Sequence, residues 1–334
     1  MTVFFGKETG YRACRIEAPC KINLHLEVGE KRSDGYHSLE SIFVPLALAD
    51  TLRFEKGARH LFGDDQLFVD WEIPGECIPG EFIPNEAIPP EKNLVTRAVS
   101  LFRERTGYSD ALSIRLIKRI PIGAGLGGGS SDAASTLLAL NSLAGTALAM
   151  ADLGEMAALL GSDVPFFLHG GPALVKGRGE LMEPVNIPGE FWVVLVKPPY
   201  SSDTASSYRL LDWYRERATP ERGKEKLPLA AIVRSLEGDP GTWPFYNDFQ
   251  SLFLNPDPSL KEANEPHAGT YRAILNSLQD TGASFSALSG SGSCCFGIYT
   301  QRETAEIAEK QLSGKGNFTR LTFFLARKAD PVLE

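Results

Sequence analysis

The sequence lacks the features that direct a chain to a membrane, to export or to nucleic acid. Its 334 residues contain no apolar run long enough to span a bilayer, and Lys7 and Glu8 follow the start too closely for a signal-peptide core. Basic residues are outnumbered, 34 Lys and Arg against 42 Asp and Glu, for a formal net charge of −8. Because nucleic-acid binders usually carry a basic patch, we expect a cytoplasmic protein without nucleic-acid or membrane partners.

Cysteine and histidine are scarce and show no metal-binding pattern. Five of each are present, without a C-x-x-C pair or a His/Cys cluster. The cysteines are Cys14, Cys20, Cys77, Cys294 and Cys295. Their odd number and single adjacent pair predict reduced thiols, and we expect no metal site built by the protein alone.

The spacing of apolar residues predicts a mixture of strands and helices. Alternation indicates strands over residues 12–28, 38–48, 51–55, 112–116, 172–176, 191–197, 284–288, 293–299 and 318–326. Helical spacing indicates helices over residues 93–105, 133–144, 152–160, 204–217, 227–235, 268–280 and 302–312. Since consecutive strands open the chain and the two types then mix, we expect an α+β protein of two parts.

One segment concentrates the acidic residues. Residues 64–91 hold eight acids and no Lys or Arg, so the rest of the chain is formally neutral, with 34 acids against 34 bases. The pattern Ile-Pro-x-Glu-x recurs four times between Ile73 and Lys92. Proline at every fifth residue excludes a helix and a central strand. We therefore predict an extended surface loop over residues 64–92 that accounts for the net charge, with a partner-docking arm as the alternative.

A glycine-rich loop at residues 121–132 joins the predicted strand 112–116 to the predicted helix 133–144. Glycines allow positive φ and close backbone approach, and a helix N-terminus attracts anions, so the segment predicts a phosphate-binding loop. A Walker A loop is excluded because no Lys separates the glycines from the following serines. A dinucleotide-binding loop is a minor alternative, since the required second strand ending in an acid is replaced by helical sequence.

Residues 121–134 resemble the second motif of the GHMP kinases, a superfamily of small-molecule kinases. Residues 18–24 resemble its first motif and residues 286–294 its glycine-rich third, in the expected order. The resemblance implies an ATP-binding, ribosomal-protein-like domain at residues 1–178, with segment 64–92 inserted, and a ferredoxin-like domain at residues 179–334. The active site is expected between them.

Three further segments point to one branch of the superfamily. They are residues 34–37 (Asp-Gly-Tyr-His), the triple glycine ending at Gly129, and residues 162–165 (Ser-Asp-Val-Pro). The resemblance implies ATP- and Mg²⁺-dependent phosphorylation of the 2-hydroxyl of a cytidine diphosphate-linked methylerythritol, in non-mevalonate isoprenoid biosynthesis, by a monomer or weak homodimer. A kinase for a homoserine- or mevalonate-like alcohol is the alternative, and a non-catalytic RNA-binding module is a weaker one.

The resemblance also implies individual roles. Asp163 is expected as catalytic base, with Lys21 beside it; without the resemblance, a helix cap and a surface lysine would be the ordinary interpretations. The residues expected at ATP are Asn93, Lys118, Pro121, Ile122, Gly123, Ala124, Gly125, Leu126, Gly127, Gly128, Gly129, Ser130 and Ser131. Those expected at the acceptor substrate are Asn23, Tyr36, His37, Asp163, Thr204, Tyr208, Gly290 and Gly292. Mg²⁺ is expected to arrive with ATP and to contact Ser130 or Ser131.

Overall fold

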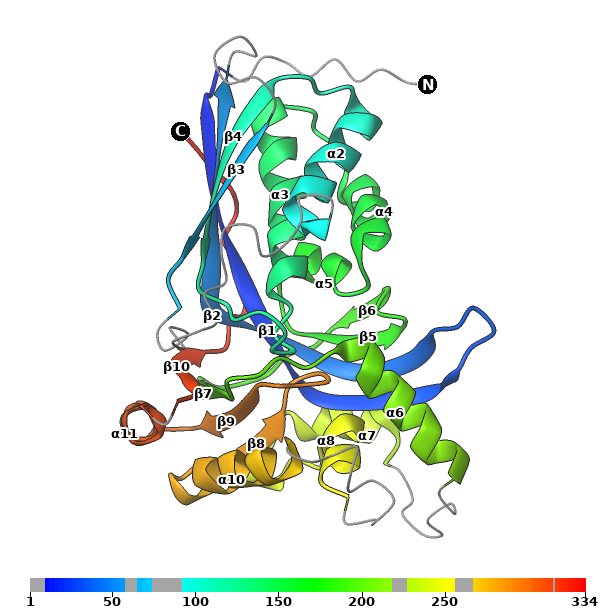
Figure 1. Cartoon of the computed structure of the whole chain (residues 1–334), viewed down its shortest axis with the longest axis vertical. Helices are drawn as coiled ribbons and strands as arrows, with labels where there is room; N and C mark the ends of the chain where they lie inside the picture. The colour runs from blue at the N-terminus through cyan, green and yellow to red at the C-terminus, as the bar shows by residue number, and fades with distance from the viewer. Residues whose placement is uncertain (1–9, 58–64, 74–91, 218–226, 256–266, 315) are drawn as a thin grey trace.

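Two sheets organise the chain into two lobes, which lie at the top and bottom of Figure 1. The computed structural model describes residues 10–57, 65–73, 92–217, 227–255, 267–314 and 316–334. The first described residues meet the C-terminus in the upper lobe, where Arg12 N and Ala13 N both donate to Glu334 O. The chain therefore leaves the upper lobe, builds the lower one and returns.

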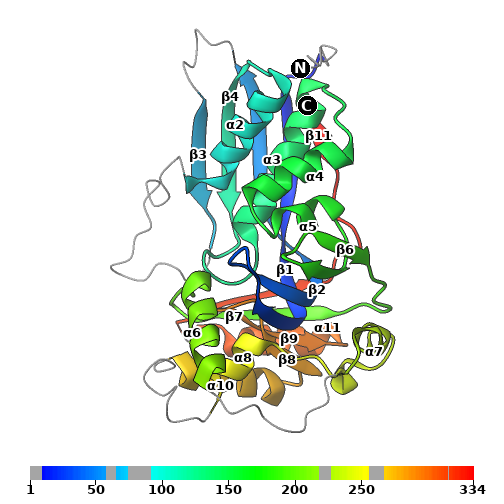
Figure 2. The same cartoon turned by 90° about the vertical axis from the view of Figure 1, so that its right-hand side faces the viewer.

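The upper lobe is a sheet covered on one face by helices (Figure 2). Its strands follow the order β11-β1-β2-β4-β3, and β5 and β6 extend it from β2. The strands are β1 (Ala13–Lys31), β2 (His37–Gly57), β3 (Gln66–Trp71), β4 (Ala111–Lys118), β5 (Ala173–Gly177), β6 (Leu181–Pro184) and β11 (Val332–Leu333). The helices are α2 (Leu94–Thr106), α3 (Gly128–Ala144), α4 (Met150–Leu160) and α5 (Val164–His169).

The lower lobe has the topology of a ferredoxin-like domain. Its sheet contains β7 (Trp192–Lys197), β8 (Phe285–Leu288), β9 (Cys295–Tyr299) and β10 (Phe318–Phe323). These pair in the antiparallel order β10-β7-β9-β8, which is fourth, first, third and second along the chain. The helices are α6 (Thr204–Arg217), α7 (Leu229–Ser235), α8 (Asp248–Phe253), α10 (His267–Asp280) and α11 (Arg302–Leu312), with a 3-10 turn, η2 (Pro240–Thr242). The predicted α+β class and ferredoxin-like layout are confirmed.

The hairpin of β1 and β2 belongs to both lobes. Its first part, including Ile16, packs under α2 and α3 in the core of the upper lobe. Further along, Ile22 and Leu24 join a second core with Val193 and Phe296 of the lower sheet. Irregularities in the β1–β2 register fall between Pro19 and Lys21 and between Asn23 and His25. Such bulges turn side chains locally, and these lie in the predicted first motif.

The second strand is longer than the sequence pattern predicted. The expected strands 38–48 and 51–55 are one continuous strand, β2. Asp50 lies in the interruption between them and is fully buried. A buried charge breaks the apolar alternation but not the backbone ladder, because β1 pairs with β2 on both sides of it. The expected helix 133–144 also begins earlier, at Gly128.

The prediction of a loop over all of residues 64–92 is wrong at its start. Residues 66–71 form β3, an edge strand that pairs in parallel with β4 from Gln66 to Trp71. Residues 74–91, which hold most of the repeat, lie outside the described part of the chain. The acidic and proline-rich sequence that follows β3 obscured a strand only six residues long.

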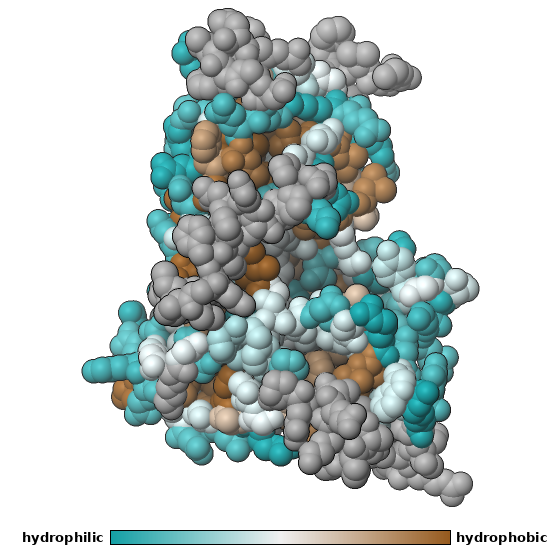
Figure 3. Space-filling model, in the orientation of Figure 1, coloured by the Kyte–Doolittle hydropathy of each residue, from teal (hydrophilic) through white to brown (hydrophobic). Residues whose placement is uncertain are grey.

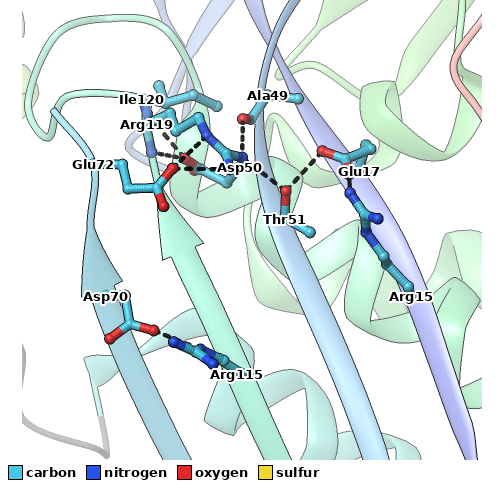
Figure 4. Close-up of polar contacts among 10 residues, drawn as sticks. All are labelled: Arg15, Glu17, Ala49, Asp50, Thr51, Asp70, Glu72, Arg115, Arg119 and Ile120. Carbon is cyan, nitrogen blue, oxygen red and sulfur yellow. Dashed lines mark hydrogen bonds and ion pairs between the residues drawn. The ribbon is translucent and has the colours of Figure 1, made fainter.

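The acids beside β3 are paired within the upper lobe. Arg103 binds Asp65, Arg115 Nε lies 2.6 Å from an Asp70 oxygen, and Arg119 Nη2 lies 3.0 Å from a Glu72 oxygen. Figure 4 shows the pairs of Asp70 and Glu72. Three of the eight acids in residues 64–91 are therefore paired with arginines at a folded sheet edge. The net charge of the chain does not come from one solvated loop.

The upper sheet continues past the expected division at residue 178. Strand β6 pairs with β5, and β11 at the end of the chain pairs with β1. The backbone between β10 and β11 is attached to the upper lobe, where Lys328 N donates to Gly170 O. The division at residue 178 stays a prediction.

Disulfides and membrane-spanning helices can be assessed for the described residues. Cys14, Cys20, Cys294 and Cys295 are buried and form no disulfide. No helix in the described ranges combines the length and the apolar character needed to cross a membrane.

Core packing at α2 gives a stability prediction. Phe102 is completely buried, with its ring edge-on to Tyr108 at a centroid distance of 6.0 Å. We expect Phe102→Ala to lower the free energy of unfolding by about 3–5 kcal/mol, measured by urea denaturation. The control is Leu159→Ala, because Leu159 is 59% exposed, and its effect should stay within about 0.5 kcal/mol. Equal effects of the two changes would contradict this packing.

Candidate active site

A cleft of about 330 Å³ lies where the two lobes meet. At this level the end of the β1–β2 hairpin projects from the molecule, with a largely hydrophilic surface (Figure 3). The lining residues come from β1 and β2, the glycine loop, α2, α3, the turn before α5, α6, α8 and the β8–β9 loop. They are Lys21, Asn23, Leu26, Leu39, Phe43, Leu94, Pro121, Gly123, Ala124, Gly125, Leu126, Gly127, Gly128, Gly129, Ser130, Asp163, Thr204, Tyr208, Phe249, Gly290 and Ser291.

The glycine loop and the loop between β8 and β9 are packed backbone against backbone. Gly125 has φ +74°, and a Cβ there would overlap the carbonyl oxygen of Ser289. Ser289 Oγ donates to Gly125 O at 3.0 Å, and Cys294 N donates to Ala124 O at 3.1 Å. At its end the loop meets β1, where Lys21 N donates to Leu126 O at 2.9 Å. The three motifs of the sequence are therefore in direct contact.

Lys21 and Asp163 form an ion pair on the cleft wall. Lys21 Nζ lies 3.5 Å from Asp163 Oδ2 and donates to Asn23 Oδ1 at 2.7 Å. Asn23 in turn donates to Ser41 Oγ at 2.9 Å, and the ammonium lies 4.6 Å from the ring centroid of Phe43. Lys21 is only 4% exposed. These contacts hold a cation in one place beside a carboxylate that solvent can reach.

The structure excludes the ordinary interpretations of both residues. Asp163 occupies the N-cap position of α5, but its side chain makes no capping hydrogen bond. Lys21 is buried rather than a surface lysine. The Asp163 side chain is directed to the cleft and the ammonium, and it is 33% exposed.

A second group of polar side chains joins α6 to the end of the β1–β2 hairpin. The rings of His37 and Tyr208 are stacked at 5.0 Å, and His37 Nε2 lies 2.7 Å from Asp212 Oδ1. Lys31 also donates to Asp212. Partial burial favours the neutral acid, but hydrogen bonds from His37 and Lys31 lower the pKa of Asp212. Burial, and after it the nearby Asp163 carboxylate, raises the pKa of Tyr208 to about 12.

Other expected substrate residues occupy less direct positions. Tyr36 is 54% exposed and lies under the Arg178 guanidinium, outside the cleft lining. Thr204 begins α6 and shares a hydrogen bond with Ser291 Oγ at 3.0 Å. Gly290 lies on the wall, while Gly292 faces Tyr271 Oη instead.

Two residues expected near adenine or ribose have other partners. Asn93 is the N-cap of α2, and its side chain accepts from Val95 N at 2.9 Å. Lys118 is 5% exposed, is not part of the cleft wall, and binds Asp50 and Asp132. Burial disfavours its charge, yet the carboxylates of Asp132 and Asp50 raise its pKa. Burial raises the pKa of Asp132, against the effect of Lys118. The structure thus puts Lys118 behind the glycine loop, where it pairs with Asp50 and Asp132.

Two hydroxyl groups lie at the start of α3, that of Ser130 on the cleft wall and that of Ser131 fully buried. Within the described part of the chain, the buried Ser131 Oγ has no hydrogen-bond partner. Mg²⁺ binds oxygen ligands. Phosphate groups and water molecules usually supply most of these ligands, so the protein needs to contribute only one or two. No cluster of three His, Cys, Asp or Glu side chains suited to a metal occurs among these residues.

Sequence reasoning missed the residues that hold the predicted ones in place. Asp212 follows Thr204 and Tyr208 at intervals of four, so helical spacing could have put it on their face. Nothing local indicated its contact with His37, 175 residues away. Asp50 and Ser41 were missed for the same reason, because each contacts a predicted residue, Lys118 or Asn23, from a different strand.

Comparison with known proteins identifies the family. The GHMP kinases N terminal domain matches residues 93–171, and the GHMP kinases C terminal domain matches residues 252–317. A 4-diphosphocytidyl-2-C-methyl-D-erythritol kinase from Treponema pallidum is 35% identical over 301 residues, covering 89% of this chain and 94% of that protein. The chain belongs to the 4-diphosphocytidyl-2-C-methyl-D-erythritol kinase family. The Chlorobium limicola member is 36% identical, over 92% of this chain and 96% of its own.

A solved member of this kinase family shares the fold. The crystal structure of 4-(cytidine 5'-diphospho)-2C-methyl-D-erythritol kinase superposes with a TM-score of 0.69 at 32% identity. The match covers 93% of this chain and 98% of that one. The two-lobed GHMP kinase fold expected from the motifs is thereby confirmed.

The contact between the two glycine loops gives a test of the cleft. In Gly125→Ala, the new Cβ would strike the Ser289 carbonyl and force the loops apart. We expect kinase turnover to fall about 100-fold, since misplacement by about 1 Å costs that much. Gly107→Ala is the matched control, because Gly107 has φ +73° with open space around its Cβ position. Steady-state kinetics should show near-normal turnover for the control; similar losses in both variants would contradict the role of the contact.

Proposed function

We propose that the protein transfers the γ-phosphoryl group of ATP to the 2-hydroxyl of 4-diphosphocytidyl-2-C-methyl-D-erythritol, releasing ADP and the 2-phosphate. The observation that carries this is the Lys21–Asp163 pair, which shares one cleft with the glycine loop. Family membership supports the substrate, since the relatives carry its name. The reaction is a step of non-mevalonate isoprenoid biosynthesis.

Asp163 is the proposed base. Its carboxylate accepts the proton of the acceptor hydroxyl as the oxygen attacks phosphorus, and general bases of this kind contribute about 10²–10⁴ in rate. Lys21 stabilises the ionised carboxylate and the negative charge on the transferring group. Asn23 and Phe43 restrict the ammonium to this place, because one accepts its hydrogen bond and the other presents a ring face.

The glycine loop is the proposed phosphate site. Positive φ at Gly123, Gly125 and Gly127 lets the backbone turn tightly. Because these residues have no side chains, a ligand can approach the backbone of the loop closely. The N-terminus of α3 follows at once, and its free N–H groups favour an anion. Mg²⁺, when bound, would neutralise phosphate charge. Ser130 and Ser131 are the proposed protein contacts for that ion.

The stacked His37 and Tyr208 mark the proposed end of the cleft for the cytidine. Tyr208 lines the cleft and is the proposed ring for stacking with a base, while discrimination among bases needs a fixed polar partner. The contact with Asp212 fixes the His37 ring. Tyr36 and Thr204 are proposed to complete this end. A cytoplasmic location and a monomer or weak homodimer belong to the same proposal.

Asp163→Asn tests the base. We expect turnover to fall by about 10²–10⁴, because the amide cannot accept the proton, while ADP affinity measured by calorimetry stays within about twofold. Asp152→Asn is the control: Asp152 only accepts from Ala149 N at the start of α4, and turnover should be unchanged. Near-normal turnover of Asp163→Asn would overturn the assignment.

Substrate competition tests the acceptor. With ATP present, we expect kcat/KM for the cytidine-linked substrate to exceed that for an uncytidylated methylerythritol, homoserine or mevalonate by at least about 100-fold, because binding energy from the nucleotide is used at the reacting end. ADP release in a coupled assay measures it. Preference for an uncytidylated alcohol would instead support the other kinase hypothesis.

A further inference from the structure

Three charged side chains meet directly behind the glycine loop, outside the cleft. Asp50 comes from β2, Lys118 is the last residue of β4, and Asp132 lies in the first turns of α3. They are 0%, 5% and 3% exposed, respectively. None of them lines the cleft. Such burial of three charges is costly unless each is paired and serves the surrounding structure.

Asp50 holds the backbone where the glycine loop begins. Its Oδ1 accepts from Arg119 N at 2.5 Å and from Ile120 N at 2.9 Å. Figure 4 shows these contacts at the point where β4 gives way to the loop. The other oxygen, Oδ2, accepts from Lys118 Nζ. One carboxylate therefore binds two consecutive amides and the side chain before them.

Lys118 carries the same connection to the helix at the far end of the loop. Its ammonium donates to Asp132 Oδ2 at 2.8 Å. The first turn of α3 packs directly against Ile120 and the Lys118 ammonium. A Cβ at Gly128 would lie 2.9 Å from Ile120 Cγ2 and 3.5 Å from Lys118 Nζ. These contacts fix the distance between the first backbone amides of α3 and the end of β4, the strand that precedes the loop.

We propose that Asp50, Lys118 and Asp132 are positioning residues that set the separation of the two ends of the phosphate-binding loop. They act on ATP through backbone amides rather than by contact. The inference rests on the proposed function only in that the loop binds nucleotide phosphates. Its effect should therefore appear in nucleotide affinity, whatever alcohol is phosphorylated.

The test compares Asp50→Ala with Asp50→Asn and Lys118→Met. We expect Asp50→Ala and Lys118→Met to raise both the KM for ATP and the Kd for ADP at least tenfold. Asp50→Asn should raise both by less than Asp50→Ala does, because its amide oxygen still accepts from Arg119 N and Ile120 N although its NH2 group cannot accept from Lys118 Nζ. Hydrogen exchange of those two amides, followed by mass spectrometry, should accelerate in Asp50→Ala and remain slow in Asp50→Asn.

Asp65→Ala is the matched control. Asp65 also accepts a backbone N–H, that of Leu112, and binds an arginine, but it does so at the opposite end of β4. It should lose thermal stability and keep the ADP Kd of the wild type. The proposal is overturned if folded Asp50→Ala binds ADP within twofold of the wild type, or if Asp65→Ala weakens binding equally. Should Asp50→Ala fail to fold, Lys118→Met decides by the same limits.

ADP titration needs no acceptor, so it separates this proposal from the reaction. If the variants bind ADP normally and the wild type phosphorylates the cytidine-linked substrate, the positioning role is refuted and the proposed function stands. Weakened ADP binding together with no phosphorylation of the cytidine-linked substrate by the wild type would support the role and refute the proposed acceptor.

Discussion

The β1–β2 hairpin is the constraint on which the rest of the molecule depends. Its 19- and 21-residue strands run through the cores of both lobes. A shift of one residue in their register would exchange the faces of every side chain, so the hydrophobic cores of both lobes together specify the register. Lys21 lies between these regions, and its position beside Asp163 follows from that register.

The cleft results from three backbone segments brought together at this hairpin. The glycine loop contacts β1 through Leu126 and the β8–β9 loop through Gly125. Side chains on these glycines would occupy the space between the segments, so the same residues that allow close packing also leave open the proposed phosphate site. Function and assembly of the two lobes therefore use one set of contacts.

The pairing of charged side chains also depends on the tertiary structure. The chain is acidic overall, yet three acids beside β3 are paired with arginines, and two further acids surround Lys118 behind the loop. The cleft itself presents the Lys21 ammonium and backbone amides to an anion. Net charge alone said nothing about this arrangement, because pairing is decided by neighbours in space.

The sequence by itself determined the α+β class, most strands and helices and the glycine loop, because local spacing and short motifs carry that information. It also singled out Lys21 and Asp163 as candidates, through the first motif and the segment at residues 162–165. The strand β3, the continuity of β2 and the place of Lys118 were decided only by tertiary structure. Each depends on a partner distant in sequence: β4 for β3, β1 for the middle of β2, and Asp50 for Lys118. Local patterns record burial and turns, whereas pairing energies between distant segments leave no local trace.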